Sequence, residues 1–146
     1  MRVIFAADHA GYELKEVLKS FVEGLGHTVV DVGAHAYDAA DDYIPFMKAA
    51  AAEVAADPAT KAIILGKSGE GEAMVANRTR GVRAAVYYGG APEIITLSRE
   101  HNDANALSLG AAFLNDDDAK AAVKVWLETP FSGEARHARR IAEIDG

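Results

Sequence analysis

Hydrophobic residues follow two patterns along this chain. Short apolar runs bounded by glycine or charged residues indicate buried strands, and stretches with apolar residues three and four positions apart indicate helices. The segment 14–25 shows the helical pattern and is followed by Gly26, a residue that commonly ends a helix. The expected strands are residues 2–7, 27–32, 62–65, 82–88 and 106–110. The expected helices are residues 14–25, 46–56, 72–77, 93–101, 119–127 and 132–144.

Strands thus alternate with helices five times. This alternation predicts an α/β fold, a doubly wound parallel sheet of five strands with helices on both faces. No internal repeat or linker interrupts the pattern, so we expect residues 1–146 to form one domain. Ligands of such sheets bind at the carboxyl ends of the strands. Polar residues that directly follow a strand are therefore the first candidates for a functional site.

Composition narrows the possible functions. No apolar run approaches the ~20 residues that a membrane helix needs, so we expect no membrane partner. The net charge of −7 argues against nucleic acid as a partner. Without a secretory leader, and without any cysteine, the chain is expected to be cytoplasmic and to lack disulfides and thiolate metal sites. No histidine pair has a metal-binding spacing, so we expect neither a metal nor another cofactor.

The turn after the third expected strand carries the strongest chemical signal. Its glycines allow a sharp turn and close approach to a ligand, and the following helix N-terminus offers free N–H groups, so the turn can cradle an anion. The helix dipole there favours the ionised form of Glu72, which can act as a general base. The alternative is a tight turn with a surface acid. The turn consists of Gly66, Lys67, Ser68, Gly69, Glu70, Gly71 and Glu72.

Asp8 and His9 follow the first strand and can reach the same crevice as the glycine turn. The alternative for this pair is a helix-capping aspartate with an incidental exposed histidine. His101 and Asn102 follow a helix, where a histidine can simply complement the helix dipole.

Arg136 and Arg140 concentrate positive charge on an otherwise acidic chain. They are four positions apart on an expected helix, so they share one side and can grip one phosphate together. A cationic run of this kind can also be a solvated helix face.

Taken together, these segments resemble the type B ribose-5-phosphate isomerase family, which includes sugar-phosphate isomerases of galactose and allose metabolism. The resemblance extends in order over nearly the whole chain. It implies a Rossmann-like sheet in a homodimer (a tetramer is the alternative) with active sites at the subunit interface. The matching segments are residues 8–11, 14–15, 26–27, 30–33, 68–71, 76–78, 81–85, 99–105 and 136–140.

The resemblance also implies a reaction. The family interconverts an aldose phosphate and a ketose phosphate through an enediolate, without metal. One branch has a cysteine base at the position of Gly66, and the other has a glutamate at the position of Glu72; this chain, which lacks cysteine, is similar to the second. Glu72 would move a proton from carbon 2 to carbon 1 of the open sugar. Ser68 and the N–H groups of residues 69–71 would hold the developing oxyanion.

The remaining roles come from the same resemblance. His101 and Asp8 would assist ring opening, and Asn102 would lie near the sugar oxygens. His9, Arg136 and Arg140 would hold the phosphate. The two arginines would reach it from the other subunit of the dimer. The rest of the expected substrate pocket is Tyr43, Gly66, Lys67, Gly69, Glu70 and Gly71.

Two departures from the family pattern concern the phosphate. Residues 110–112 lack the arginine of a Gly-x-Arg pattern, having Ala112 in its place, and Lys67 stands where glycine is usual. We hypothesise that Lys67 partly replaces the missing charge. The leading prediction is an isomerase of ribose 5-phosphate and ribulose 5-phosphate. The alternatives are an isomerase of a hexose 6-phosphate or an unphosphorylated sugar, and a non-catalytic subunit that binds sugar phosphate.

Overall fold

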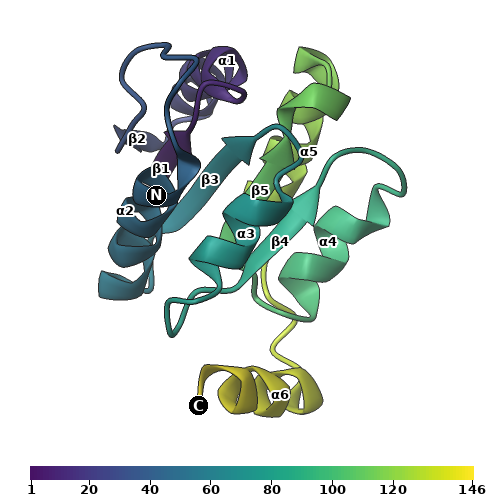
Figure 1. Cartoon of the computed structure of the whole chain (residues 1–146). Coiled ribbons are helices and arrows are strands. Elements are labelled where there is room, and N and C mark those ends of the chain that lie inside the picture. Colours follow the sequence, from purple (N-terminus) through teal and green to yellow (C-terminus); the bar gives the residue numbers. More distant parts are fainter.

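The computed structural model describes residues 1–146 and contains the expected alternation of strands and helices (Figure 1). The strands are β1 (Arg2–Ala7), β2 (Thr28–Asp31), β3 (Lys61–Gly66), β4 (Ala84–Tyr87) and β5 (Ala106–Gly110). The helices are α1 (Tyr12–Gly24), α2 (Tyr43–Ala56), α3 (Glu70–Ala76), α4 (Glu93–Glu100), α5 (Asp116–Glu128) and α6 (Ala135–Asp145). None of these helices combines the length and apolar character needed to cross a membrane.

All five strands are parallel, in the order β2-β1-β3-β5-β4. The chain leaves β1 for the edge strand β2 and then returns past β1 to β3, so its winding direction reverses between β1 and β3. A reversal of this kind leaves a crevice at the carboxyl ends of the two strands. Ala7 at the end of β1 pairs in register with Leu65 of β3. The residues that follow these two strands therefore emerge side by side.

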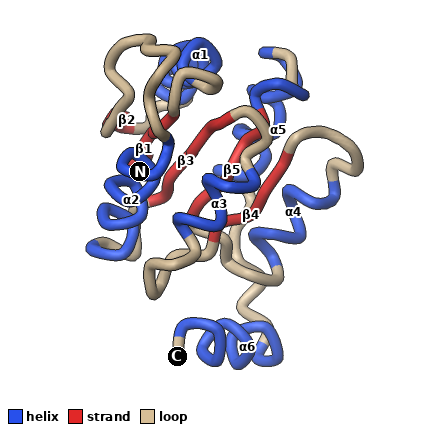
Figure 2. Tube along the Cα trace, viewed as in Figure 1, coloured by secondary structure: helices blue, strands red, loops and turns tan.

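Helices cover both faces of the sheet, which confirms the predicted doubly wound fold (Figure 2). One face packs against α1, α4 and α5 around residues such as Leu18, Leu107 and Trp126. The other face packs against α2 and α3 around residues such as Met47 and Ile64. Strands buried on both faces need apolar side chains at successive positions, which explains the continuous apolar runs in the sequence.

Several element bounds differ from the prediction. The helix α3 begins at Glu70 and not at residue 72, because Gly69 adopts a left-handed φ of 80° and ends the turn early. The helix α2 begins at Tyr43, since the Asp42 side chain accepts a hydrogen bond from Ile44 N and caps it. The last helix begins at Ala135 and not at residue 132. Strand β4 is limited to four residues, 84–87.

The last helix, α6, lies beyond the amino-terminal edge of the sheet and apart from its two covering layers (Figure 1). Its end is attached by Arg83, whose Nη1 lies 2.6 Å from Asp145 Oδ2. Of its residues only His137 is buried. The exposed cationic residues of α6 therefore face away from the chain's own core.

Candidate active site

The glycine turn places the Glu72 carboxyl group directly over the end of β3. A Cβ atom built on Gly66 would lie 1.7 Å from Glu72 Oε1. A side chain at position 66 and the carboxyl group of Glu72 therefore compete for the same space. This explains in steric terms why glycine precedes the turn when glutamate follows it.

The turn is held from the neighbouring strand β5. The buried Ser108 donates a hydrogen bond from Oγ to the carbonyl oxygen of Gly69, at 2.6 Å. A Cβ atom on Gly110 would lie 2.6 Å from the Ser68 carbonyl oxygen, so glycine there lets the turn lie flat on β5. Ser68 Oγ accepts a hydrogen bond from Glu70 N at 3.2 Å. Sequence reasoning missed Ser108, although a lone hydroxyl within an apolar strand was the available signal.

Burial decides the protonation behaviour of Glu72. The residue is only 5% exposed, and this loss of solvent raises the pKa of its carboxyl group. Backbone N–H groups of the turn oppose the rise, while the nearby charge of Asp8 adds to it. The expectation that the helix N-terminus would favour the ionised form is therefore wrong in its net effect. A carboxylate with a raised pKa is a stronger base, which suits proton abstraction near neutral pH.

Asp8 leaves the carboxyl end of β1 and is 7% exposed. Its Oδ1 accepts hydrogen bonds from the backbone N–H groups of Ala10 at 3.0 Å and Gly11 at 3.3 Å. A Cβ atom on Gly11 would lie 2.6 Å from Leu65 Cβ, so this turn packs tightly against β3. Asp8 thus shapes the turn into α1 and lies close enough to Glu72 to affect its titration.

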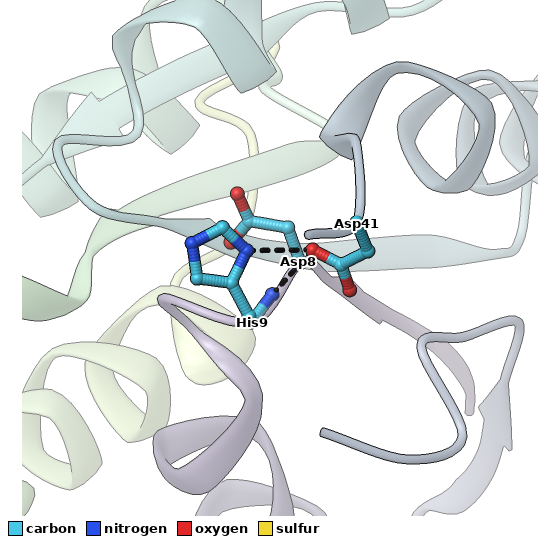
Figure 3. A group of neighbouring side chains, drawn as sticks. All are labelled: Asp8, His9 and Asp41. Carbon is cyan, nitrogen blue, oxygen red and sulfur yellow. Dashed lines mark hydrogen bonds and ion pairs between the residues drawn. The ribbon is translucent and has the colours of Figure 1, made fainter. Parts of the chain in front are cut away.

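His9 is held by an aspartate from a distant loop (Figure 3). Its ring Nδ1 lies 2.7 Å from Asp41 Oδ1, and its backbone N–H donates to the same oxygen at 3.0 Å. The hydrogen bond to Asp41 is the main reason that the pKa of His9 is raised. Tyr37 meets the imidazole ring edge-on, with 6.3 Å between ring centroids. Sequence reasoning missed Asp41, which is one of three aspartates in a polar loop and lies 32 positions from His9 along the chain.

Tyr43 brings the start of α2 to the start of α3. A Cβ atom on Gly71 would lie 2.7 Å from the Tyr43 hydroxyl oxygen. One chain therefore gathers most of the sequence-predicted site at the carboxyl edge of the sheet. These residues are Asp8, His9, Tyr43, Gly66, Lys67, Ser68, Gly69, Glu70, Gly71 and Glu72.

The other four sequence-predicted residues lie at the opposite end of the sheet, where the amino-terminal ends of its strands lie. His101 ends α4, and the Asn102 carbonyl oxygen accepts a hydrogen bond from Arg83 Nε at 3.0 Å, just before β4 begins. Arg136 and Arg140 lie on α6, beyond the same amino-terminal edge. Strands of four to six residues separate the two edges by roughly 13–20 Å. The chain by itself does not unite the two groups.

His101 packs against a second histidine. Its ring stacks on that of His137, with 4.2 Å between centroids and 18° between planes. Burial, and then the neighbouring His101, lower the pKa of His137, which is 4% exposed. Arg136 pairs with Glu134 at 3.0 Å on the exposed side of α6. This edge thus presents a histidine pair beside solvent-facing cations.

The carboxyl edge also contains the only cluster in the chain with a spacing suited to a metal. Ligand atoms of Asp8, His9 and Asp41 all lie within 4.8 Å of one another. His9 Nδ1, however, already has a protein partner in Asp41 Oδ1. A metal bound through Nδ1 would have to break that bond. The absence of a metal requirement stays a prediction.

Comparisons with known proteins show which family the chain belongs to. Residues 3–144 match the family model described as Ribose/Galactose Isomerase. Ribose-5-phosphate isomerase B of Mycobacterium tuberculosis is 43% identical over 97% of this chain and 86% of that protein. The structure of ribose-5-phosphate isomerase B from Clostridium thermocellum superimposes with a TM-score of 0.92, at 35% identity, over 99% of this chain and 95% of the other.

A second solved structure adds a ligand. Ribose-5-phosphate isomerase B from Mycoplasma genitalium, with bound ribulose 5-phosphate, has a TM-score of 0.93 and 32% identity over 99% of this chain and 93% of the other. Likeness of sequence and of fold thus both extend over nearly the whole chain. The chain belongs to the type B ribose-5-phosphate isomerase family.

Proposed function

We propose that this protein interconverts ribose 5-phosphate and ribulose 5-phosphate through an enediolate, without a metal. The observation that carries the proposal is the Glu72 carboxyl group, buried over Gly66 with a raised pKa inside a glycine turn. The family relationship supplies the substrate class, since the M. genitalium relative binds ribulose 5-phosphate. A buried carboxylate with a raised pKa is a stronger base, and abstraction of a proton beside a carbonyl requires a positioned general base.

In this mechanism Glu72 removes the proton from carbon 2 of the open-chain aldose. The electrons move into an enediolate, whose oxyanion is stabilised by Ser68 Oγ and by the N–H groups around Gly69 and Gly71. The proton of the carbon-2 hydroxyl moves to the carbon-1 oxygen of the enediolate. Protonated Glu72 then returns its proton to carbon 1, which leaves the ketose carbonyl at carbon 2. No redox partner is needed, because the hydrogen stays on the substrate.

Ring opening and phosphate binding need the residues of the other sheet edge. We infer that a second copy of the chain supplies His101, Asn102, Arg136 and Arg140 in a symmetric homodimer. The cavities of the single chain support this, since none is lined by Glu72. Exposed apolar side chains on the helices next to the sheet, such as Met74 and Leu97, offer surface for the contact.

The decisive experiment compares the wild-type protein with Glu72→Gln, in the presence of EDTA. We expect wild-type turnover of ribose 5-phosphate to persist with EDTA and the variant's kcat to fall by about 10²–10⁴-fold, with its KM nearly unchanged. Glu13→Gln is the matched control, since Glu13 also lies in the first turn of a helix but is exposed. Turnover that survives in Glu72→Gln would disprove the assignment of the base.

Ala112 stands in place of a phosphate-binding arginine, which favours the alternative that the substrate is a hexose 6-phosphate or an unphosphorylated sugar. Activity on ribose 5-phosphate, allose 6-phosphate and unphosphorylated ribose should therefore be measured in parallel. Preference for ribose 5-phosphate is the expected result. Preference for another sugar would keep the mechanism and change the substrate, and inactivity of folded protein on all three would favour the non-catalytic subunit.

A further inference from the structure

We propose that Asp41 is a positioning residue that holds the His9 imidazole as a cation facing the anionic end of the substrate. The inference deepens the proposed function and rests on it. Two features of the structure carry it: the shared hydrogen bonds of one Asp41 oxygen, and the unpaired second oxygen of the same carboxylate.

Asp41 fixes both the backbone and the ring of His9. A single oxygen, Oδ1, accepts from the His9 backbone N–H at 3.0 Å and lies 2.7 Å from ring Nδ1 (Figure 3). Because a carboxylate only accepts, Nδ1 carries a hydrogen and Nε2 is the nitrogen left for a ligand. The His9 side chain is 34% exposed, so a ligand can approach it, whereas that of Asp41 is 10% exposed.

The surroundings of His9 favour its charged form. Asp8 at the end of β1, and Asp38 and Asp41 on the loop before α2, are the ionised groups that face it, and all three are carboxylates. Tyr37 is the aromatic neighbour. Each carboxylate raises the pKa of His9, with the Asp41 hydrogen bond contributing most, and only partial burial opposes the rise. A charged imidazole can donate from Nε2 to a phosphate oxygen.

The second oxygen of Asp41 argues against a purely structural role. Oδ2 is buried and has no hydrogen-bond partner in the chain. An unpaired buried oxygen of a charged group costs stability, and an apolar residue would avoid that cost. The negative charge is better explained by its effect on His9 than by packing.

The test is Asp41→Asn, which keeps an oxygen for the hydrogen bonds and removes the charge. The pKa of His9 is followed through its imidazole signals by NMR, and we expect it to fall, because the carboxylate that stabilises the charged ring is gone. The KM for ribose 5-phosphate should rise severalfold between the His9 pKa values of the two proteins, where only wild-type His9 is charged, and converge with the wild-type value at low pH, where His9 is charged in both. The value of kcat should change little.

Asp38→Asn is the matched control, since it removes the same charge from the same loop but its carboxylate bonds only to Ala40 N, at 2.9 Å. It should lower the His9 pKa less than Asp41→Asn does, because Asp38 contributes least to the rise, and it should leave KM close to wild type. An unchanged His9 pKa in Asp41→Asn, or a rise in KM that is equal at every pH, would overturn the proposal.

Two probes separate this inference from the proposed function. Inorganic phosphate should shift the His9 signals of the wild-type protein and shift them less in Asp41→Asn, whether or not the protein isomerises a sugar. The absence of any phosphate effect on His9 would refute the positioning role itself. Mg²⁺ should leave the signals unchanged. A Mg²⁺-dependent shift would replace the proposal with a cation site at Asp8, His9 and Asp41.

Discussion

At the residue scale, close contacts at glycine positions determine where the Glu72 carboxyl group and its turn lie. The Glu72 carboxyl group lies where a side chain at Gly66 would lie, and the turn rests on β5 because Gly110 has no side chain. These contacts place a buried carboxyl group beside backbone N–H groups without ordering any flexible side chain other than that of Glu72 itself. The geometry of the base is therefore sensitive to single added atoms.

Gly66→Ala is expected to displace the Glu72 carboxyl group and lower kcat by at least about 10²-fold, because the new Cβ overlaps it. Overpacking of this kind should also cost about 1–3 kcal/mol of stability. Gly24→Ala provides the control, since nothing lies within 4 Å of its added Cβ. Equal kcat values for the two variants would show that the carboxyl position does not matter.

The raised pKa of Glu72 has consequences for pH dependence. Because the ionised form of Glu72 is the proposed base, the acidic limb of the kcat/KM profile should lie at a higher pH than a solvent-exposed glutamate would give. The folded state binds this proton more tightly than the unfolded state, so the ionised carboxylate destabilises the fold at pH 8. Glu72→Gln should have a higher Tm than wild type at pH 8, a difference that disappears near pH 4. Parallel melting curves at all pH values would contradict the assigned pKa shift.

Lys67 is the chain's own candidate for the missing phosphate charge. It is exposed on the glycine turn, and its carbonyl oxygen accepts a hydrogen bond from Ala112 N at 3.1 Å, so positions 67 and 112 are neighbours. Lys67→Ala is expected to raise the KM for ribose 5-phosphate severalfold with little change in kcat. Lys48→Ala, another exposed lysine, should change neither. An unchanged KM in Lys67→Ala would show that the lysine only faces solvent.

A buried ion pair joins elements at the next scale. Lys15 of α1 is fully buried, and its Nζ lies 2.8 Å and 2.9 Å from the two carboxylate oxygens of Asp31 at the end of β2. Lys19 Nζ lies 2.7 Å from the same carboxylate. Burial alone would raise the pKa of Asp31, but the hydrogen bonds from the two lysines outweigh it and lower the pKa. This pair ties α1 to the edge strand beside the site.

Asp31→Asn should destabilise the protein at pH 7 by up to about 3–5 kcal/mol, because it leaves the buried Lys15 ammonium without its counter-charge. Since the folded pKa of Asp31 is depressed, its contribution is present above the unfolded pKa and is lost as pH falls through the folded value. Urea denaturation should therefore show the wild-type advantage shrinking in acid. Glu128→Gln, from an exposed pair with Lys124, should cost less than about 1 kcal/mol. A similar loss in both variants would mean that burial of the pair is unimportant.

At the scale of the whole molecule, the proposed homodimer would use two half-sites at opposite ends of the strands of one sheet. The carboxyl edge holds Glu72 and its glycine turn, and the amino edge holds His101 with the arginines of α6. A two-fold axis that brings one edge of a chain against the other edge of its copy makes two complete sites. Helix α6 lies apart from the sheet and its covering helices in Figure 1, a position from which it could contact a second copy of the chain.

This arrangement predicts complementation between two inactive variants. Refolding Glu72→Gln with His101→Asn in equal amounts should restore about a quarter of wild-type activity, because half the dimers are mixed and each has one intact site. The double variant on one chain, mixed with Glu72→Gln, should stay inactive. No recovery in the first mixture would mean that both residues act within one chain.

Much of this architecture could be predicted from local patterns. Apolar runs, helical spacing and the position of Gly26 were enough for the alternation of strands and helices, and the glycine turn was enough to place Glu72 in the first turn of a short helix after β3. These signals are short-range, because a strand, a helix cap or a tight turn is determined by a few neighbouring residues. The errors fell where local signals are weak, as at the start of α3, where a left-handed Gly69 ended the turn two residues early.

Other features were decided only by the tertiary structure. The sequence by itself determined that a sheet exists and which turn carries the proposed base. It did not determine the strand order, the hydrogen bond from Ser108 to Gly69 or the bond between Asp41 and His9. The residues of these contacts are 39 and 32 positions apart, respectively. The net rise in the pKa of Glu72 also needed the packed structure, because the sequence shows the helix N-terminus but not the burial that outweighs it. Distant residues meet only through packing of the whole sheet, and no local pattern records which of them will meet.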